Sequence, residues 1–187
     1  MFKFYYGCMG AGKTTEIIKT YDIYRRKGLD PVIIKPAIDT REGNFSGWGT
    51  TASRITKEAV PAYYYTDLKK ELFYLNYGSI LVDEAQFMSR EDVHFLALVA
   101  DKQQVPVLTY GLKTDVNGNL FEGSAALLAL VDETKELESL CQIDHCQNKA
   151  IGHARFVNGV RDTSGASVVI EKGNVTYLAV CRKHMRE

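Results

Sequence analysis

The sequence has no long apolar run, no excess of charge of either sign, and few cysteines. Its 187 residues include 23 lysines and arginines against 23 aspartates and glutamates, so no global basic surface for nucleic acid is expected. No apolar run approaches the ~18 residues of a membrane span. The opening MFKFYYGCMG has neither the apolar core nor the cleavage site of a signal peptide. We therefore expect a cytoplasmic protein that binds neither membrane nor nucleic acid.

The four cysteines are unevenly placed. Cys8 stands near the start, whereas Cys141, Cys146 and Cys181 all lie in the last quarter. In a reducing compartment such thiols are free or metal-bound more often than disulfide-bonded. Hydrophobic residues make up 45% and charged residues 25%, as in folded globular proteins. The length suits one domain with a small appendage, and the cysteine placement indicates the same division.

Strand-like and helix-like segments alternate over most of the chain. Strands are expected at 3–7, 31–37, 59–65, 79–87 and 105–112, helices at 14–27, 67–75, 89–102 and 125–133, and long loops at 38–54 and 113–124. Ser89 and Asp92 fit the S-x-x-D pattern of a capping box at the start of the third helix. This alternation predicts an α/β fold with a parallel sheet. Beyond Cys141 the pattern changes to short β-like pieces joined by polar turns. We therefore predict two parts, a nucleotide-binding α/β domain over 1–140 and a metal-binding subdomain over 141–187.

A phosphate loop is the first functional motif. The stretch GCMGAGKT begins at Gly7 and fits G-x-x-x-x-G-K-[ST], whose glycines let backbone N–H groups surround an anion at a helix N-terminus. Lys13 would reach the β- and γ-phosphates of ATP, and the Thr14 hydroxyl would bind Mg²⁺. A chance glycine-rich turn is the alternative, but the motif follows a predicted strand and opens a predicted helix. The residues expected at the nucleotide are Gly7, Cys8, Met9, Gly10, Ala11, Gly12, Lys13, Thr14 and Thr15.

Two acids end the apolar strand SILVDE. Asp83 is suited to hold the magnesium, directly or through water. Glu84 follows at once and could take a proton from an attacking oxygen. The sequence alone leaves open whether that oxygen belongs to water, as in an ATPase, or to a substrate hydroxyl, as in a kinase.

Three cysteines and a histidine form two pairs near the C-terminus. Cys141 and Cys146 form a C-x₄-C pair, and Cys181 and His184 form a C-x₂-H pair. Three thiolates and one imidazole suit a closed, tetrahedral, structural Zn²⁺ site. The alternative is three unpaired buried cysteines. His145 lies inside the first pair and competes with His184 as the fourth ligand, but neighbouring Cys and His side chains seldom both face one metal.

With these elements in place, the chain resembles the small, zinc-containing thymidine kinases, the type II family. DEAQF (83–87) matches the acidic motif of that family, and KPAIDTR (35–41) is similar to its Asp-Thr-Arg segment. GLKTDVNGNLF (111–121), CQNKAIGHAR (146–155) and VVIEKGNVTYLAVCRKH (168–184) resemble three further family segments. The five matches occur in the family's order along nearly the whole chain.

The resemblance implies a RecA-like core and a zinc-tied lasso that lies over a nucleoside. Glu84 would deprotonate the 5′-hydroxyl of thymidine, Arg41 near Asp39 would arrange charge at the transferred phosphoryl group, and Gln86 would lie at the nucleotide. The implied nucleoside-pocket residues are Phe87, Leu112, Phe121, Val168, Ile170 and Tyr177. It further implies thymidine and ATP as substrates, thymidine triphosphate (dTTP) as a feedback ligand, and a homotetramer.

The chain departs from the family at several positions. Its first metal pair is C-x₄-C rather than C-x₂-C, Val116 replaces the usual phenylalanine, Gln147 replaces glycine, and His153 stands at a threonine position. These changes concern base selectivity more than phosphoryl transfer. Two other functions are weighed against the kinase, a small ATPase in which Glu84 activates water and an ATP-gated zinc-ribbon module that binds nucleic acid.

Overall fold

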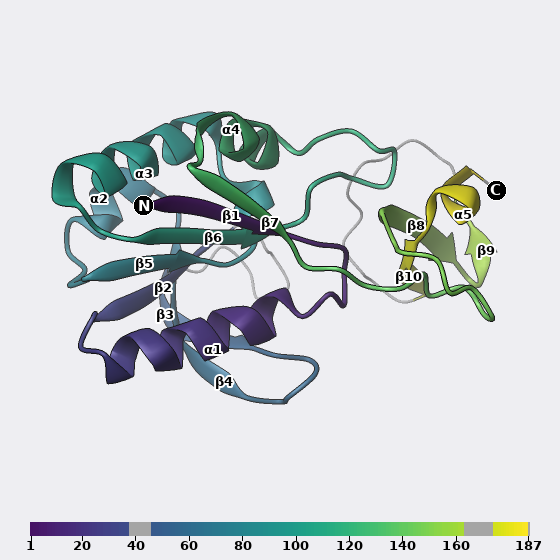
Figure 1. The fold of residues 1–187 in the computed structure, drawn as a ribbon, viewed down its shortest axis with the longest axis horizontal. Helices are drawn as coiled ribbons and strands as arrows, with labels where there is room; N and C mark the ends of the chain where they lie inside the picture. Colours follow the sequence, from purple (N-terminus) through teal and green to yellow (C-terminus); the bar gives the residue numbers. More distant parts are fainter. Residues whose placement is uncertain (38–45, 163–173, 187) are drawn as a thin grey trace.

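A seven-stranded sheet forms the larger part of the protein (Figure 1). The structure is a computed structural model and describes residues 1–37, 46–162 and 174–186. The strand order is β3-β4-β2-β5-β6-β1-β7, and every pair is parallel except β3 with β4. The strands are β1 (Phe2–Tyr6), β2 (Pro31–Pro36), β3 (Gly47–Ala52), β4 (Ala59–Tyr65), β5 (Ser79–Val82), β6 (Val107–Gly111) and β7 (Glu133–Glu136). The predicted α/β fold with a parallel sheet is confirmed.

Helices cover both faces of this sheet (Figure 1). α1 (Lys13–Arg26) lies on one face, and α2 (Leu68–Leu72), α3 (Arg90–Gln103) and α4 (Glu122–Leu130) lie on the other. Alternate side chains of β5 therefore enter different cores: Leu81 packs with Ile17 of α1, whereas Ile80 and Val82 pack on the α3 side. A strand buried on both faces is apolar throughout, which explains the continuous run in SILV.

Two segments differ from the sequence prediction. Residues 47–52 were expected in a long loop but form β3, an antiparallel edge strand paired with β4. This strand contains Gly47 and Gly49, and a Cβ at Gly49 would lie 2.9 Å from the Tyr64 ring. The strand is therefore recognisable by its close packing against β4 and not by an alternation of apolar residues in the sequence. The helix expected at 125–133 begins earlier, at Glu122, and residues 133–136 instead form β7.

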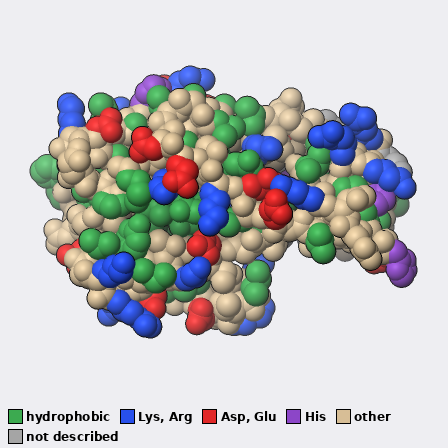
Figure 2. Space-filling model, in the orientation of Figure 1, with side chains coloured by type: hydrophobic (Ala, Val, Ile, Leu, Met, Phe, Trp, Pro, Cys, Tyr) green, Lys and Arg blue, Asp and Glu red, His purple; other side chains and the backbone are tan. Residues whose placement is uncertain are grey.

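A second, smaller sheet contains β8 (Gly152–Val157), β9 (Val160–Arg161) and β10 (Val175–Val180), in the order β10-β8-β9, and is followed by α5 (Arg182–Arg186). All its pairs are antiparallel. It lies to one side of the large sheet (Figure 1). Figure 2 shows acidic and basic side chains interspersed over the larger body, whereas several Lys and Arg side chains gather on the smaller part. The division near residue 140 stays a prediction.

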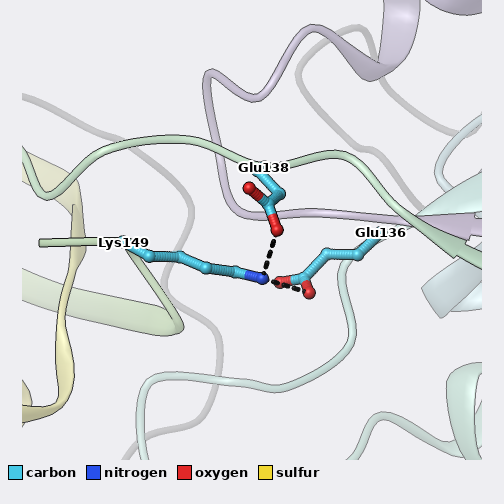
Figure 3. A network of polar contacts seen from close by, with 3 residues as sticks. All are labelled: Glu136, Glu138 and Lys149. Atoms are coloured by element: carbon cyan, nitrogen blue, oxygen red, sulfur yellow. Dashed lines mark hydrogen bonds and ion pairs between the residues drawn. The ribbon is translucent and has the colours of Figure 1, made fainter.

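An ion-pair network fastens the connection between the two sheets (Figure 3). Lys149 Nζ lies 2.5 Å from Glu136 Oε2, at the end of β7, and 2.8 Å from Glu138 Oε1. The hydrogen bond that Lys149 donates to Glu136, followed by the one that it donates to Glu138, raises the pKa of Lys149. The chain that leaves the large sheet is thus held against the segment that leads into β8.

The start of α3 offers a test of the local sequence reasoning. The expected capping box is present, because Ser89 Oγ accepts from Asp92 N at 3.1 Å and Asp92 Oδ2 accepts from Ser89 N at 3.3 Å. We expect Ser89→Ala to lower the free energy of unfolding in urea by about 1 kcal/mol. His94→Ala, at an exposed position of the same helix, is the control and should change it little. Equal effects of the two substitutions would contradict a capping role.

Candidate nucleotide and metal sites

The phosphate loop connects β1 to α1, and its shape depends on glycine. Gly10 and Gly12 have φ angles of +77° and +80°, in the left-handed region that favours glycine. A Cβ at Gly7 would lie 2.5 Å from the carbonyl oxygen of Leu137. The loop closes on itself where Ala11 N donates to Cys8 O at 3.1 Å. These residues thus form the loop that the motif predicted, at the N-terminus of α1.

Lys13 is largely buried beneath the loop. Its Nζ donates to the carbonyl oxygens of Gly7 at 3.0 Å and Cys8 at 2.9 Å. Burial lowers the pKa of Lys13, while the nearby Glu84 and Asp83 act in the opposite direction. The amine and the two carboxylates are therefore close enough to interact electrostatically.

Asp83 is buried at the end of β5, and both of its carboxylate oxygens accept hydrogen bonds. Thr51 Oγ1 donates to Oδ2 at 2.7 Å, and the backbone N of Glu84 donates to Oδ1 at 3.0 Å. Burial raises the pKa of Asp83, as does the neighbouring Glu84, whereas Lys35 lowers it. Thr51 belongs to β3, in a segment predicted to be loop, so sequence reasoning missed this contact. No local motif could have shown it, because the two residues are 32 positions apart.

Glu84 has a backbone conformation that is unusual for its residue type. Its φ and ψ are 53° and 38°, a left-handed conformation that costs energy for a non-glycine residue and is often found at functional sites. The buried Gln86 orients its carboxylate: Gln86 Nε2 donates to Glu84 Oε2 at 2.7 Å, while Gln86 Oε1 accepts from Leu112 N at 3.0 Å. The acid is thus fixed relative to the end of β6.

Glycines allow this turn to pack against its neighbours without side chains between them. A Cβ at Gly111 would lie 2.8 Å from Gln86 Oε1, and a Cβ at Gly123 would lie 2.5 Å from the carbonyl oxygen of Ala85. The turn around Glu84 is therefore held between the end of β6 and the start of α4.

The structure brings part of the expected nucleoside pocket together. The rings of Phe87 and Phe121 are edge to face, with centroids 5.9 Å apart, and Ser124 Oγ donates to the Leu112 carbonyl at 2.5 Å. Tyr177 lies in β10 of the second sheet, opposite Arg155 in the strand register. The predicted residues Arg41, Val168 and Ile170 lie outside the described residues.

The four predicted metal ligands do meet. The ligand atoms of Cys141, Cys146, Cys181 and His184 all lie within 4.8 Å of one another. His184 Nδ1 is 3.3 Å from Cys141 Sγ and 3.5 Å from Cys181 Sγ. A backbone hydrogen bond from His184 is the largest cause that lowers the pKa of Cys181 to about 6, which favours the thiolate that a metal requires. His145 is not part of this group.

A phosphate loop next to paired acids in a parallel sheet defines a P-loop nucleotide-binding protein, and its Cys₃His cluster could hold a metal ion. The sequence model of the family described as thymidine kinase matches residues 1–185. The chain belongs to the thymidine kinase family.

Similar proteins cover nearly the whole chain. A thymidine kinase of Legionella pneumophila (strain Lens) is 41% identical over 191 residues, which cover 98% of this chain and 88% of that protein. A thymidine kinase of Streptococcus pyogenes serotype M3 is 41% identical over 183 residues, which cover 96% of this chain and 93% of that protein.

Among the described residues, no helix is both long and apolar enough to cross a bilayer.

The cluster makes a prediction about metal content. We expect the purified protein to carry about one divalent metal ion per chain and Cys146→Ser to lose most of it, together with thermal stability, because a thiolate ligand is removed. Elemental analysis and thermal unfolding would measure both. Cys8→Ser changes the one cysteine outside the cluster and should keep the metal. Full metal content in Cys146→Ser would show that the cluster is not the site.

Proposed function

We propose that the protein is an ATP-dependent thymidine kinase, which transfers the γ-phosphate of ATP to the 5′-hydroxyl of thymidine. The observation that carries this proposal is the placement of Glu84, immediately after the buried Asp83, in an electrostatically coupled site with Lys13. Family membership over residues 1–185 supports the same reaction. Phosphoryl transfer needs mainly positioning and charge neutralisation, and this site provides groups for both.

Each of these residues has a separate part in the mechanism. Lys13 leaves the carbonyls of Gly7 and Cys8 and binds the β- and γ-phosphates, so its present contacts are replaced by the nucleotide. Thr14 and Asp83 hold Mg²⁺, which neutralises phosphate charge when bound. Arg41 adds positive charge at the transferred group, as the family resemblance implies.

Glu84 accepts the proton of the 5′-hydroxyl as that oxygen attacks phosphorus. Its hydrogen bond from Gln86 keeps one carboxylate oxygen in place, and the second bond of Gln86, to Leu112 N, relates that carboxylate to a residue of the proposed nucleoside pocket. We therefore assign Gln86 to positioning Glu84 rather than to direct nucleotide contact. Phe87, Leu112 and Phe121 would wall the nucleoside, with Tyr177, Val168 and Ile170 on the lasso side.

We assign zinc to the Cys₃His cluster, with a structural role. Three thiolates and an imidazole suit tetrahedral Zn²⁺, and four protein ligands leave no open position for catalysis. The metal would join the turn at Cys141 and Cys146 to the Cys181–His184 segment. The resemblance also supports dTTP as a feedback ligand, with its base in the nucleoside pocket and its phosphates in the loop, and supports a cytoplasmic homotetramer.

The test is transfer of label from γ-labelled ATP with Mg²⁺ to each of the four deoxynucleosides, with a control that contains no nucleoside. Labelled monophosphate from thymidine is the expected result, and the other nucleosides report how Val116 and His153 affect base selectivity. Free phosphate without a labelled nucleoside would overturn the proposal in favour of an ATPase. DNA binding with a steep salt dependence would instead favour the nucleic-acid module.

Replacement of Glu84 tests the assignment of the base. We expect Glu84→Gln to reduce kcat by about 10²- to 10⁴-fold, because the amide cannot accept the proton, while ADP binding measured by calorimetry stays within about threefold. Glu91→Gln, at an exposed position of α3, is the matched control and should keep full activity. Wild-type turnover in Glu84→Gln would refute the assignment.

A further inference from the structure

The C-terminal part of the chain approaches the phosphate loop at three consecutive residues. Cys8 Sγ donates to the carbonyl oxygen of Gly152 at 3.7 Å, and Met9 N donates to His153 Nε2 at 2.8 Å. A Cβ at Gly10 would lie 3.6 Å from the side-chain nitrogen of Gln142. Figure 1 shows the β1–α1 connection extending toward this smaller part of the protein. The far end of the chain thus packs along the first half of the loop.

The groups on the second-sheet side are themselves held in place. Gln142 follows Cys141 in sequence; its Oε1 accepts from Ala179 N at 2.7 Å, and its backbone N donates to Ala179 O at 2.8 Å. Gly152 and His153 begin β8, which pairs along its whole length with β10. This support combines the pairing of β8 with β10 and the segment that begins at Cys141 of the Cys₃His cluster.

The buried His153 can accept the hydrogen bond from Met9 N–H in only one protonation state. A neutral imidazole can accept at Nε2 from Met9 N–H while its other nitrogen forms a hydrogen bond with the backbone of Thr114. A protonated imidazole carries N–H at both nitrogens and would oppose the Met9 donor. The charged and titratable groups that surround it are Tyr6, Cys8, Lys113 and Glu136, which line the same narrow cavity, and Lys13.

We propose that His153 is a positioning residue for ATP: as a neutral hydrogen-bond acceptor it fixes the backbone of the phosphate loop and makes nucleotide affinity depend on the part of the chain that carries the Cys₃His cluster. The inference rests on the proposed binding of ATP at this loop. Met9 N–H is directed to His153 instead of the nucleotide, and the loop residues that follow are thereby pre-organised around the phosphates, which lowers the cost of binding.

Burial lowers the pKa of His153 to about 4, and the positive charge of Lys13 acts in the same direction. The folded-state pKa therefore lies below the unfolded value of 6.5. It follows that the contribution of His153 to stability is complete above about pH 6.5 and declines as the pH falls toward 4. Near neutral pH the acceptor state is the populated one.

Two variants with opposite expectations test the proposal. His153→Phe removes the acceptor, whereas His153→Gln places an amide oxygen near the position of Nε2 and does not titrate. We expect ADP affinity, measured by calorimetry at pH 7.5, to fall about five- to tenfold in the Phe variant, as for the loss of one buried hydrogen bond, and to stay within about threefold in the Gln variant. The KM for ATP should follow the affinity for ADP.

Unchanged ADP affinity in His153→Phe would overturn the proposal, and so would an equal loss of ADP affinity in His153→Phe and His153→Gln. Thermal unfolding and metal content establish that each variant is folded. If the Phe variant does not fold, the pH dependence of the other two proteins decides: between pH 7.5 and 5, wild type should lose more stability than His153→Gln, and an equal loss would refute the acceptor role. ADP binding needs no turnover, so a wild-type protein without thymidine kinase activity would refute the proposed function and still answer this question.

Discussion

The fold must bury one carboxylate, that of Asp83, next to a second carboxylate and an ammonium group. Asp83 is 2% exposed, and burying a charge is costly unless it is paired and hydrogen-bonded. Lys35 and the Thr51 hydroxyl lower the pKa of Asp83, and Asp83 and Glu84 in turn favour the charged form of Lys13. β3, α1 and β5 meet at this point because each contributes one of these groups. The position of the edge strand is thus understandable from electrostatics as well as packing.

The parts that sequence could predict are those whose residues are neighbours along the chain. The phosphate loop, the Asp83–Glu84 pair and the Cys₃His cluster are read from short spacings, and the helix at Ser89 is read from its capping residues. Buried parallel strands are visible as continuous apolar runs, since both faces are covered. The order of those strands in the sheet and the position of the second sheet cannot be predicted in this way, because they depend on tertiary packing.

The contacts that sequence could not predict join distant segments through backbone groups or single side chains. β3 pairs by backbone hydrogen bonds and packs through glycine, so its sequence GWGTTA has no apolar alternation. The bond from Met9 to His153 spans 144 positions. The motif reading identified His153 only as a departure from a family pattern and connected it with base selectivity. The structure also shows the imidazole in contact with the phosphate loop, a contact that no spacing rule encodes.

Contacts within the second sheet hold the described residues on both sides of residues 163–173. Before residues 163–173 the chain is held by the pair between Arg155 and Asp162, 2.7 Å apart, and by Asn158 N, which donates to Asn174 O at 3.0 Å where the chain returns. Asn158 and Asn174 are therefore held beside each other by their own backbone contact. The entropy of closing a chain segment grows only logarithmically, by about 0.6 kcal/mol for each doubling of its length. A change in the number of residues between Asn158 and Asn174 would thus cost the folded state little.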